Sequence, residues 1–543
     1  MARRIVILGL LVAALALGAA GCGSSSSGSG KDGGTMRATF SAFPDYLDPA
    51  LSYTAEGWTA TWSTYIPLLT YAHESGQAGS KVIPGLAEAL PKISNGGKTY
   101  TLRLRAGLKY SDGTPVRASD FKSTVERVFL LNSGGSSYYS SIVGAEEFAK
   151  TKQGGIPGIE TDDKSGEIRI ELTGPRGTFT NELALPFVAL VPAGTPAEDL
   201  SKDPPPATGP YEIVSSTPGR GWEYARNPQW AKANGELIPE LPDGYMDRIE
   251  IDVVRNASAQ VEDVERGVYA WMGNPPPADL YSQVKNEFEG TQFRVEPTET
   301  NYFFWMNTEA APFADPQVRQ AVNYAVNPEA LERIYSGQLV AGQQVLPPGM
   351  PGYEQFELYP YDVAKAKALV AAADPADLEV TVWTENASPH DEAGEYLADV
   401  LGEIGFETEL KVLNPDNYFA VIGNEKTPDL DIGWASWFPD YPHPNGFFEP
   451  MFSEASIYPT NNTNLARFAD PKVSAEIERL ASGPLDPEVE AEYAELDEEV
   501  MAAAPWAPYG VATFPTFVSS EIDLDAVVFN PTFSQDLASF RFK

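Results

Sequence analysis

Cysteine, histidine and positive charge are all scarce in this chain of 543 residues. Its single cysteine, Cys22, rules out an internal disulfide. Its three histidines, His73, His390 and His443, are far apart in the sequence, so they support neither a zinc site with paired histidines nor a Ser-His-Asp triad. We expect all three to lie on the surface, and we expect neither a bound metal nor a cofactor.

Enzyme motifs are lacking as well. The Gly-x-Ser-x-Gly motif of serine hydrolases does not occur. Residues 28–33 match a dinucleotide fingerprint by letters only, because no strand precedes them. The run Gly96-Gly97-Lys98-Thr99 ends like a phosphate loop, but Lys92 stands where the first glycine is required, so a hairpin is predicted instead. Carboxylates are too numerous for one pair to stand out as general acid and base. We therefore predict that the chain is not an enzyme.

Positive charge is too scarce for a nucleic-acid partner. The chain has 38 Lys plus Arg against 76 Asp plus Glu, a net charge of −38 at pH 7. Such a chain is repelled by phosphate backbones. Two interpretations of the acidity stay open: general solubility with self-repulsion, and attraction of cationic or amine-bearing solutes.

No apolar run is long enough to span a membrane. The longest one, residues 5–17, has about 13 residues, whereas a spanning helix needs about 20. Arg3 and Arg4 precede this run and small residues follow it, which is typical of a secretion signal. We expect residues 1–21 to be a signal peptide.

Cys22 stands directly after the small residues, and residues 17–22 resemble the lipobox that lipoprotein signal peptidase cleaves. Ala19 departs from the pattern, which more often has leucine there. The resemblance implies that Cys22 becomes an acylated N-terminus. An ordinary signal peptide with an incidental thiol is the alternative. The Ser- and Gly-rich run that follows predicts a flexible tether as far as residue 34.

Secondary structure is predicted most densely between residues 93 and 129. Residues 100–105 alternate apolar and polar side chains, which predicts a strand. The run Asp112-Gly113-Thr114-Pro115 is typical of a turn, and Ser119 is expected to cap a helix. The apolar face of that helix should contain Phe121, Val125, Val128 and Phe129.

The rest of the chain follows an α/β pattern. Alternation predicts strands near residues 168–172, 249–253, 378–384, 406–412 and 430–434. Proline after a capping residue predicts helices that begin at Pro316 and Pro328. A helix at residues 391–404 joins two of the strands into a βαβ unit. Prolines 204–206 and the irregular segment after Ala504 suggest crossings between lobes, a geometry suited to hinge closure.

Several motifs together resemble the family 5 extracytoplasmic solute-binding proteins, the peptide-binding components of ABC importers. They occur in order and at matching spacing over most of the chain. They are Leu47-Asp48-Pro49-Ala50, Pro84-Gly85-Leu86-Ala87-Glu88, Leu108-Lys109-Tyr110-Ser111-Asp112-Gly113-Thr114-Pro115, Thr208-Gly209-Pro210-Tyr211, Arg226-Asn227-Pro228, Leu346-Pro347-Pro348-Gly349-Met350 and Asp440-Tyr441-Pro442.

This resemblance implies an α/β, two-lobed periplasmic-binding-protein-like fold with an extra domain, of the type II, large peptide-binding class. The implied division places the main domain of lobe I at residues 35–66, 207–305 and 510–543, its extra domain at 67–206, and lobe II at 306–509. A lipid-anchored monomer on the extracytoplasmic face of the membrane would capture peptides, or a similar amine-bearing solute, and deliver them to a membrane permease.

The resemblance also implies a ligand site. In family members that bind peptides, an aspartate after a tryptophan-containing strand holds the α-ammonium of the ligand, and Asp440 occupies that place. A buried ammonium needs such a counter-charge. Ser436, Trp437 and Phe438 would offer backbone groups to an extended ligand, while Trp434, Trp437 and Tyr441 would form walls of side-chain pockets. The alternative is that the aromatic residues belong to the core and that Asp440 caps a turn.

Two further segments are candidates for the site: Tyr53 with Ala55, and the aromatic run that contains Tyr302 and Trp305. Strand alternation sends residues 302 and 304 one way and residues 303 and 305 the other, so at most one pair faces the ligand. The sequence departs from the family where Trp434 replaces an arginine of some oligopeptide binders, so capture of a ligand carboxylate is unsupported.

The identity of the ligand stays open at this level, because a fold does not fix a ligand. A receptor of the same fold for a nickel chelate, an oligosaccharide or an opine is the nearest alternative. A secreted hydrolase or a signalling receptor without a transport role is the alternative from another class.

Overall fold

The computed structural model describes residues 32–415, 417–460 and 462–543. The predictions for the signal peptide, for Cys22 and for most of the tether lie outside the described residues. Within the described ranges, no helix has the length and apolar character that crossing a membrane requires.

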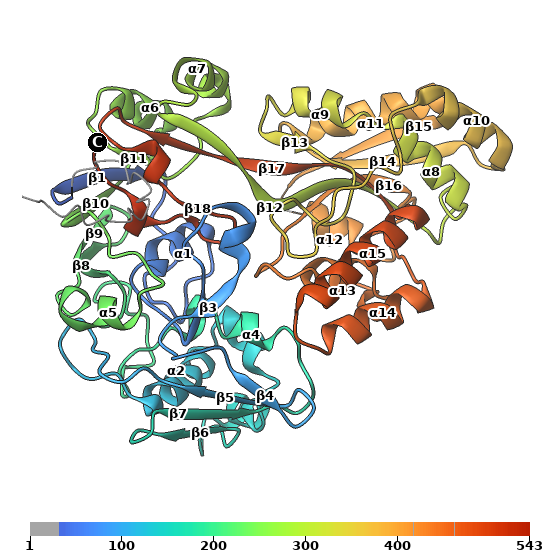
Figure 1. Cartoon of the computed structure of the whole chain (residues 1–543). Helices are drawn as coiled ribbons and strands as arrows, with labels where there is room; N and C mark the ends of the chain where they lie inside the picture. Colours follow the sequence, from blue (N-terminus) through green and yellow to red (C-terminus); the bar gives the residue numbers. More distant parts are fainter. Residues whose placement is uncertain (1–31, 416, 461) are drawn as a thin grey trace, which may run out of the picture.

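An eleven-stranded mixed sheet runs through both lobes of the molecule (Figure 1). Its order is β15-β14-β16-β12-β17-β11-β1-β10-β9-β8, and β13 pairs with β17 off this path. The strands are β1 (Thr35–Phe40), β8 (Tyr211–Thr217), β9 (Gly221–Arg226), β10 (Arg248–Val253), β11 (Trp271–Met272), β12 (Phe293–Met306), β13 (Leu339–Ala341), β14 (Glu379–Glu385), β15 (Glu407–Leu413), β16 (Ile432–Trp437) and β17 (Trp506–Val518). The predicted α/β architecture in two lobes is confirmed.

Two long antiparallel strands, β12 and β17, connect the lobes. They pair with each other in lobe I, where Phe293 lies opposite Phe517, and again in lobe II, where Trp305 lies opposite Trp506. Between these stretches the register shifts, because residues 298–300 of β12 lie opposite the single residue Ala512. Such a bulge bends and twists a strand. The boundaries predicted at residues 305 and 509 fall inside these two strands.

Lobe II contains the predicted βαβ unit. Strands β14 and β15 are parallel, with Glu379 opposite Glu407, and α11 (His390–Ile404) connects them. The two predicted proline starts are confirmed, since α8 (Pro316–Ala325) and α9 (Pro328–Ile334) are capped by Asp315 and Asn327. The remaining helices of this lobe are α10 (Val363–Ala373), α12 (Tyr418–Ile422), α13 (Asn445–Phe452), α14 (Pro471–Ala481) and α15 (Pro487–Ala503).

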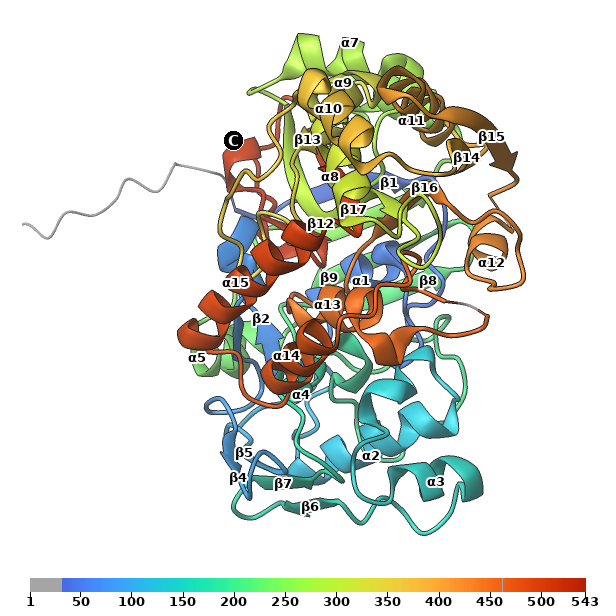
Figure 2. The same ribbon diagram turned by 90° about the vertical axis from the view of Figure 1, so that its right-hand side faces the viewer.

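Lobe I adds a four-stranded sheet of order β4-β5-β7-β6, which lies at the opposite end of the molecule from β14 and β15 (Figure 2). Its strands are β4 (Lys92–Ser94), β5 (Thr99–Arg103), β6 (Ile159–Asp162) and β7 (Glu167–Glu171). The predicted hairpin at Gly96-Gly97 is confirmed, because it joins β4 to antiparallel β5. Elsewhere in lobe I lie β2 (Leu69–Tyr71), β3 (Val82–Pro84), β18 (Phe529–Asn530), β19 (Ser534–Gln535), α1 (Ala55–Trp62), α3 (Ala145–Thr151), α4 (Phe179–Glu182), α5 (Gly235–Leu237), α6 (Ala257–Glu265) and α7 (Ala278–Phe288).

Helix α2 (Ala118–Leu130) packs on the extra sheet with the predicted face inward, since Phe121, Val125 and Val128 are fully buried. The prediction that Ser119 caps this helix is wrong. Ser119 lies in the first turn, where its hydroxyl donates to Asp163 (3.0 Å). The carboxylate of Asp120 instead accepts a hydrogen bond from the Arg117 N–H (2.8 Å), and this bond fixes the helix start.

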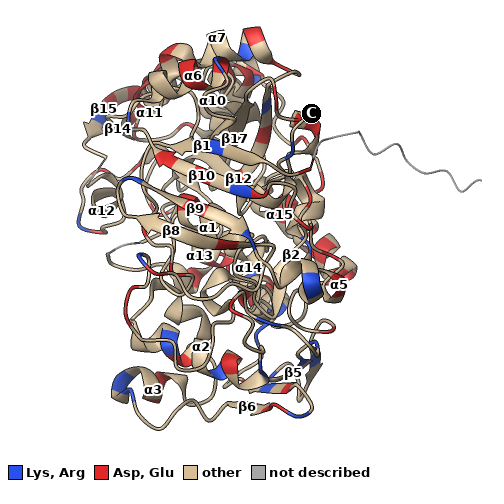
Figure 3. Cartoon of the chain, turned by 90° about the vertical axis from the view of Figure 1, so that its left-hand side faces the viewer, with Lys and Arg blue, Asp and Glu red and all other residues tan. Residues whose placement is uncertain are grey.

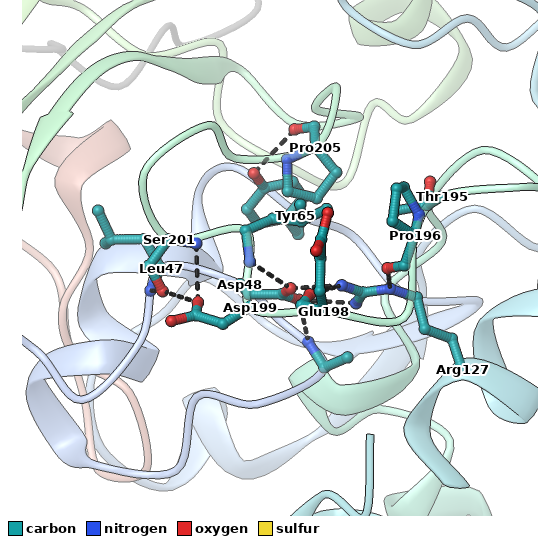
Figure 4. Close-up of polar contacts among 12 residues, drawn as sticks. Leu47, Asp48, Tyr65, Arg127, Thr195, Pro196, Glu198, Asp199, Ser201 and Pro205 are labelled. Atoms are coloured by element: carbon teal, nitrogen blue, oxygen red, sulfur yellow. Dashed lines mark hydrogen bonds and ion pairs between the residues drawn. The ribbon is translucent and has the colours of Figure 1, made fainter. Parts of the chain in front are cut away.

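A buried ion pair joins α2 to the segment after β1 (Figure 4). Arg127 donates from Nη1 to Asp48 Oδ1 (2.8 Å) and from Nη2 to Asp48 Oδ2 (2.5 Å). The same guanidinium donates to the carbonyls of Pro196 (2.7 Å) and Glu198 (2.9 Å). Both ions are therefore almost fully satisfied away from water, which explains the Leu47-Asp48-Pro49-Ala50 motif structurally.

The prediction that the three histidines are surface residues is wrong. His73 stacks on Trp62 at 4.0 Å, and its Nδ1 lies 2.6 Å from Asp536. His390 pairs with Glu385 at 2.6 Å. His443 is 1% exposed, and burial lowers its pKa to about 3, so it is neutral. The spacing of the histidines along the chain did not indicate their burial: Asp536 contacts His73 from a distant segment, whereas Glu385 and Asn445 contact His390 and His443 from nearby residues.

Asp497 of α15 holds the loop that contains the Leu346-Pro347-Pro348-Gly349-Met350 motif. Its two oxygens accept hydrogen bonds from the backbone N–H groups of Val345 (2.9 Å) and Leu346 (3.0 Å). Burial raises the pKa of Asp497 to about 7, although these hydrogen bonds and one from Gln344 oppose the shift.

We expect Asp48→Asn to destabilise the fold by about 3 to 5 kcal/mol, because it leaves Arg127 buried without its counter-ion. Urea unfolding followed by circular dichroism measures this. A matched control is Glu403→Gln, which breaks the exposed Lys367–Glu403 pair (3.0 Å) and should cost about 1 kcal/mol or less. Equal losses in the two variants would contradict a structural role for the buried pair.

We expect Asp497→Asn to reduce the loss of stability on going from pH 5 to pH 8. The raised pKa means that the folded state keeps a proton that the unfolded state has lost above about pH 4. The free energy of unfolding therefore falls as pH rises toward about 7 in the wild type, and this contribution is absent in the variant. Melting temperatures at both pH values measure the difference, and parallel pH profiles would refute the assignment.

Candidate functional site

Asp440 lies in the loop between β16 and α13 and borders two cavities. The first, here called the hinge cavity, has a volume of about 300 Å³ and lies between the lobes beside the bulge of β12. The second, the lobe II cavity, has a volume of about 480 Å³. Phe438, which is 64% exposed, also borders both. The carboxylate of Asp440 is thus accessible from two adjoining cavities.

The carboxylate of Asp440 contacts the opposite lobe. The hydroxyl of Tyr53 donates to Asp440 Oδ1 (3.0 Å), and the hydroxyl of Tyr138 lies 2.8 Å from that of Tyr53. Burial raises the pKa of Tyr53 to about 12, so its hydroxyl keeps the proton it donates. Two tyrosine hydroxyls from lobe I therefore form a hydrogen-bonded pair that contacts the carboxylate of lobe II.

Tyr53 is held in place by Asp45. The carboxylate of Asp45 accepts hydrogen bonds from the backbone N–H groups of Tyr53 (2.6 Å) and Thr54 (3.1 Å). Thr54 in turn caps α1 by accepting from the Gly57 N–H (3.2 Å). These hydrogen bonds order the backbone at the start of α1. Ala55, the first residue of this helix, also lines the hinge cavity.

The end of β16 forms one wall of the lobe II cavity. Ser436, Trp437 and Phe438 all line it, together with Phe303 of β12 and Phe419. Trp437 is fixed by its indole N–H, which donates to the carbonyl of Gly446 (2.8 Å). The exposed surface around Asp440 is thus largely aromatic.

Trp434, Tyr302 and Trp305 line neither cavity. Trp434 is 2% exposed, and its indole N–H lies within hydrogen-bond distance of the hydroxyls of Tyr509 (2.9 Å) and Tyr335 (3.1 Å). These three residues pack in the lobe II core, because β16 and β12 bury the faces that carry them. Phe303 is the member of the aromatic run that reaches a cavity.

Tyr441 lies at the contact between the lobes rather than along a cavity wall. It packs against the core of lobe I, with its ring 6.2 Å from that of Tyr138. Nearby, the Gly177 N–H of lobe I donates to the carbonyl of Ala481 (3.0 Å) in lobe II. A Cβ on Gly177 would lie 1.8 Å from the oxygen of Gly483, so this approach requires glycine.

A third cavity, of about 700 Å³, also lies between the lobes but does not include Asp440. Its lining is rich in proline, with Pro91, Pro351, Pro442, Pro484 and Pro487. Its polar lining comes from Gln77, Ser80, Lys81, Thr180, Asn181 and Glu490, and it lacks an acidic group placed between two cavities as Asp440 is. We therefore place the candidate site at Asp440.

Sequence reasoning missed Glu299, which lines the hinge cavity from the bulge of β12. Its side chain is almost fully buried, and burial raises its pKa to about 8. The hydroxyl of Ser80 lies 3.3 Å from Glu299 Oε1. No sequence signal marks this residue, because the bulge arises only when β12 pairs with β17.

The cavities beside Asp440 combine a carboxylate with aromatic rings. No group of His, Cys, Asp and Glu residues in the described part of the chain is arranged to hold a metal ion. A carboxylate among aromatic rings in a cleft suits a positively charged group with apolar neighbours. Asp and Glu positions occur along the ribbon of both lobes (Figure 3).

Comparison with known proteins gives consistent matches. The model of "Bacterial extracellular solute-binding proteins, family 5 Middle" matches residues 81–459. The chain is 28% identical over 468 residues to "Heme-binding protein A" of Haemophilus influenzae, covering 80% of each chain. It is 25% identical over 427 residues to the "Dipeptide-binding protein" of Escherichia coli, covering 72% of this chain and 74% of that one.

A solved structure shows the same fold over most of the chain. "Clavulanic acid biosynthesis oligopeptide binding protein 2" aligns with a TM-score of 0.82 and 26% identity, covering 94% of this chain and 96% of that one.

Proposed function

The chain belongs to family 5 of the bacterial extracellular solute-binding proteins, and from this premise we propose that it captures peptides, or similar small amine-bearing solutes, at Asp440 between its lobes. In this proposal the α-ammonium of the ligand binds the Asp440 carboxylate. The ligand then lies across the hinge cavity and the lobe II cavity.

The observation that carries the proposal is the position of Asp440 at the junction of the two cavities. An ammonium removed from water needs a counter-charge, since an unpaired buried charge costs several kcal/mol. Such an ammonium would replace the Tyr53 hydroxyl as the partner of Asp440. The site therefore exchanges a hydrogen bond from a neutral phenol for an ion pair with the ammonium of the ligand.

The neighbouring groups suit an extended ligand. Strand β14 pairs with β16 only at Ile432 and Gly433, so the side of Ser436 and Trp437 that faces away from β12 has no strand partner, and Phe438 follows directly. Backbone groups there can pair with a peptide irrespective of its side chains. The aromatic lining of the lobe II cavity offers apolar contact to a side chain. Tyr53 and Ala55 close the site from lobe I. The residues that line neither cavity would support the site indirectly. Three of them pack in the lobe II core (Trp434, Tyr302 and Trp305), and Tyr441 packs at the contact between the lobes.

Closure of the lobes would strip water from the ligand and strengthen its polar contacts. An affinity near micromolar corresponds to about 8 kcal/mol. One charge pair and a few backbone hydrogen bonds are enough to supply that free energy. The bulge between the two halves of β12 is the natural place for the hinge.

We further propose that the protein is a monomer anchored through acylated Cys22 on the extracytoplasmic face of the membrane, where it delivers its ligand to an ABC permease. A diacylglycerol with an amide-linked chain binds membranes stably, whereas a single acyl chain does not. A non-peptide ligand is the second candidate, because one relative is named for haem binding.

We expect Asp440→Asn to weaken binding of a small peptide at least tenfold, a loss of about 1.4 kcal/mol or more. Calorimetric titration with a panel of di- to pentapeptides and with haem measures the affinities, after native mass spectrometry has identified any co-purified ligand. A control is Glu478→Gln, which removes an exposed carboxylate of α14 that lines none of the three cavities.

N-acetylation of the best peptide tests the same contact from the other side. Acetylation removes the ammonium, so it should weaken binding to the wild type and change little in Asp440→Asn. Unchanged affinity in Asp440→Asn would reject the site, and binding of haem without peptides would favour the second candidate.

We expect Cys22→Ser to abolish lipid anchoring. In a bacterial host, the wild-type protein should partition into the detergent phase of a Triton X-114 extract, and the variant should move to the aqueous phase. The mass of the mature N-terminus checks the acyl chains directly. An aqueous wild-type protein would show that Cys22 is an incidental thiol.

A further inference from the structure

Glu299 is directed to the hinge cavity by the bulge of β12. Because three residues of β12 lie opposite Ala512, the strand cannot keep its alternation at this point. The hydroxyl of Thr298 donates to the carbonyl of Ala512 (3.0 Å), and the Thr300 N–H donates to the Thr298 hydroxyl (3.1 Å). These bonds fix the bulge, and Thr298, Glu299 and Thr300 all line the cavity.

The hinge cavity contains two carboxyl groups and no basic side chain. Asp440 and Glu299 both line it, whereas no Lys, Arg or His does. No ion pair involves Glu299 among the described residues, so none of these residues gives its buried carboxyl a positive partner. Burial disfavours the ionised form of such a group unless a cation accompanies it.

Burial raises the pKa of Glu299, although hydrogen bonds with Ser80 and Thr532 oppose the shift. The geometry at Ser80 is compatible with a proton on this carboxyl. The hydroxyl of Ser80 lies 3.3 Å from Glu299 Oε1 and 3.0 Å from the carbonyl oxygen of Gly349. A hydroxyl has one proton, so it can donate to only one of these oxygens at a time. A proton on Glu299 satisfies both contacts, because Glu299 then donates to Ser80 and Ser80 donates to Gly349.

Aromatic rings form the walls between the two carboxyl groups. Tyr53 stacks on Trp58 at 5.9 Å, and Phe514 stacks on Phe529 at 6.0 Å. All four rings line the hinge cavity. Such walls suit the methylene stem of a long cationic side chain, and their faces attract a cation.

We propose that the hinge cavity is a subsite for a second positive charge, so that preferred ligands place one amine at Asp440 and a further ammonium or guanidinium at Glu299. This inference rests on the proposed function and names the substrate class of the same site. The ligand is a peptide whose first residue is lysine or arginine, or a free diamine of similar length. The lobe II cavity, lined by Phe303, Phe419 and Trp437, takes apolar groups instead.

Binding of the second charge ionises Glu299. At pH 7 the free protein holds a proton on this carboxyl, because burial raises its pKa to about 8. The titratable groups that face Glu299 are Asp440 and Tyr53 across the cavity and Tyr71 of β2 behind it. The pKa values of both phenols are raised, so neither changes charge near pH 7. A cationic ligand should therefore release close to one proton at pH 7, and its neutral counterpart should release fewer.

The test compares Lys-Ala-Ala with norleucine-Ala-Ala, which has the same stem without the side-chain ammonium. Calorimetric titration at pH 7, in two buffers of different ionisation enthalpy, gives affinity and proton release together. We expect the wild type to bind the lysine peptide at least tenfold more tightly, with the extra proton released. Glu299→Gln should abolish both the preference and the extra proton while it keeps the affinity for the norleucine peptide.

A second variant keeps the test decisive if Glu299→Gln misfolds. Ala55→Lys places a resident cation at the rim of the hinge cavity, at an exposed position at the start of α1. This variant should weaken binding of the lysine peptide several-fold more than binding of the norleucine peptide. Titration with 1,5-diaminopentane separates the two sources, since tight binding of this compound indicates a diamine and weak binding indicates a peptide.

Equal affinity of the wild type for the lysine and norleucine peptides would overturn the inference while the proposed function stands. An equal loss of affinity for both peptides in Glu299→Gln would also overturn the inference, because Glu299 would then have only a structural role. Failure of both peptides and of the diamine to bind the wild type would instead remove the proposed function, and the inference with it.

Discussion

The continuity of β12 and β17 through both lobes is the constraint on which the rest of the structure depends. Two paired strands connect the lobes, so the relative positions of the lobes are set where this pairing loses register, at residues 298–300. On one side of the bulge the strands belong to lobe I, and on the other side they carry Phe303 to the lobe II cavity. The residues at which the pairing loses register, 298–300, therefore also line the hinge cavity.

Lobe I presents its part of the site as a firm unit. The Asp48–Arg127 pair joins the segment after β1 to α2, and Asp45 orders the chain from there to α1. Tyr53 and Tyr138 consequently come from two parts of lobe I that cannot shift freely against each other. Asp440 contacts both parts through one hydrogen-bonded pair of hydroxyls.

Local patterns predicted the elements of this fold well, because alternation and capping depend on neighbours in sequence. The βαβ unit of lobe II and the starts of α8 and α9 lie within one or two residues of their predicted places. Asp440 came from family resemblance, since no periodicity distinguishes it from other aspartates. Burial was harder to predict. Trp434 and His443 look like surface or pocket residues until distant segments cover them, and Glu299 reaches its cavity only through a mismatch between strands far apart in sequence.

The bridge between Tyr53 and Asp440 also bears on how a bound cation would leave. When the cation departs, the phenol is already within reach, so the carboxylate is never left bare in a dry crevice. During release, the hydrogen bond from the phenol would replace the ion pair as the cation leaves, so the two steps would occur together. Removing the hydroxyl of Tyr53 would therefore change the rate at which a bound cation leaves, because Asp440 would lose its replacement partner.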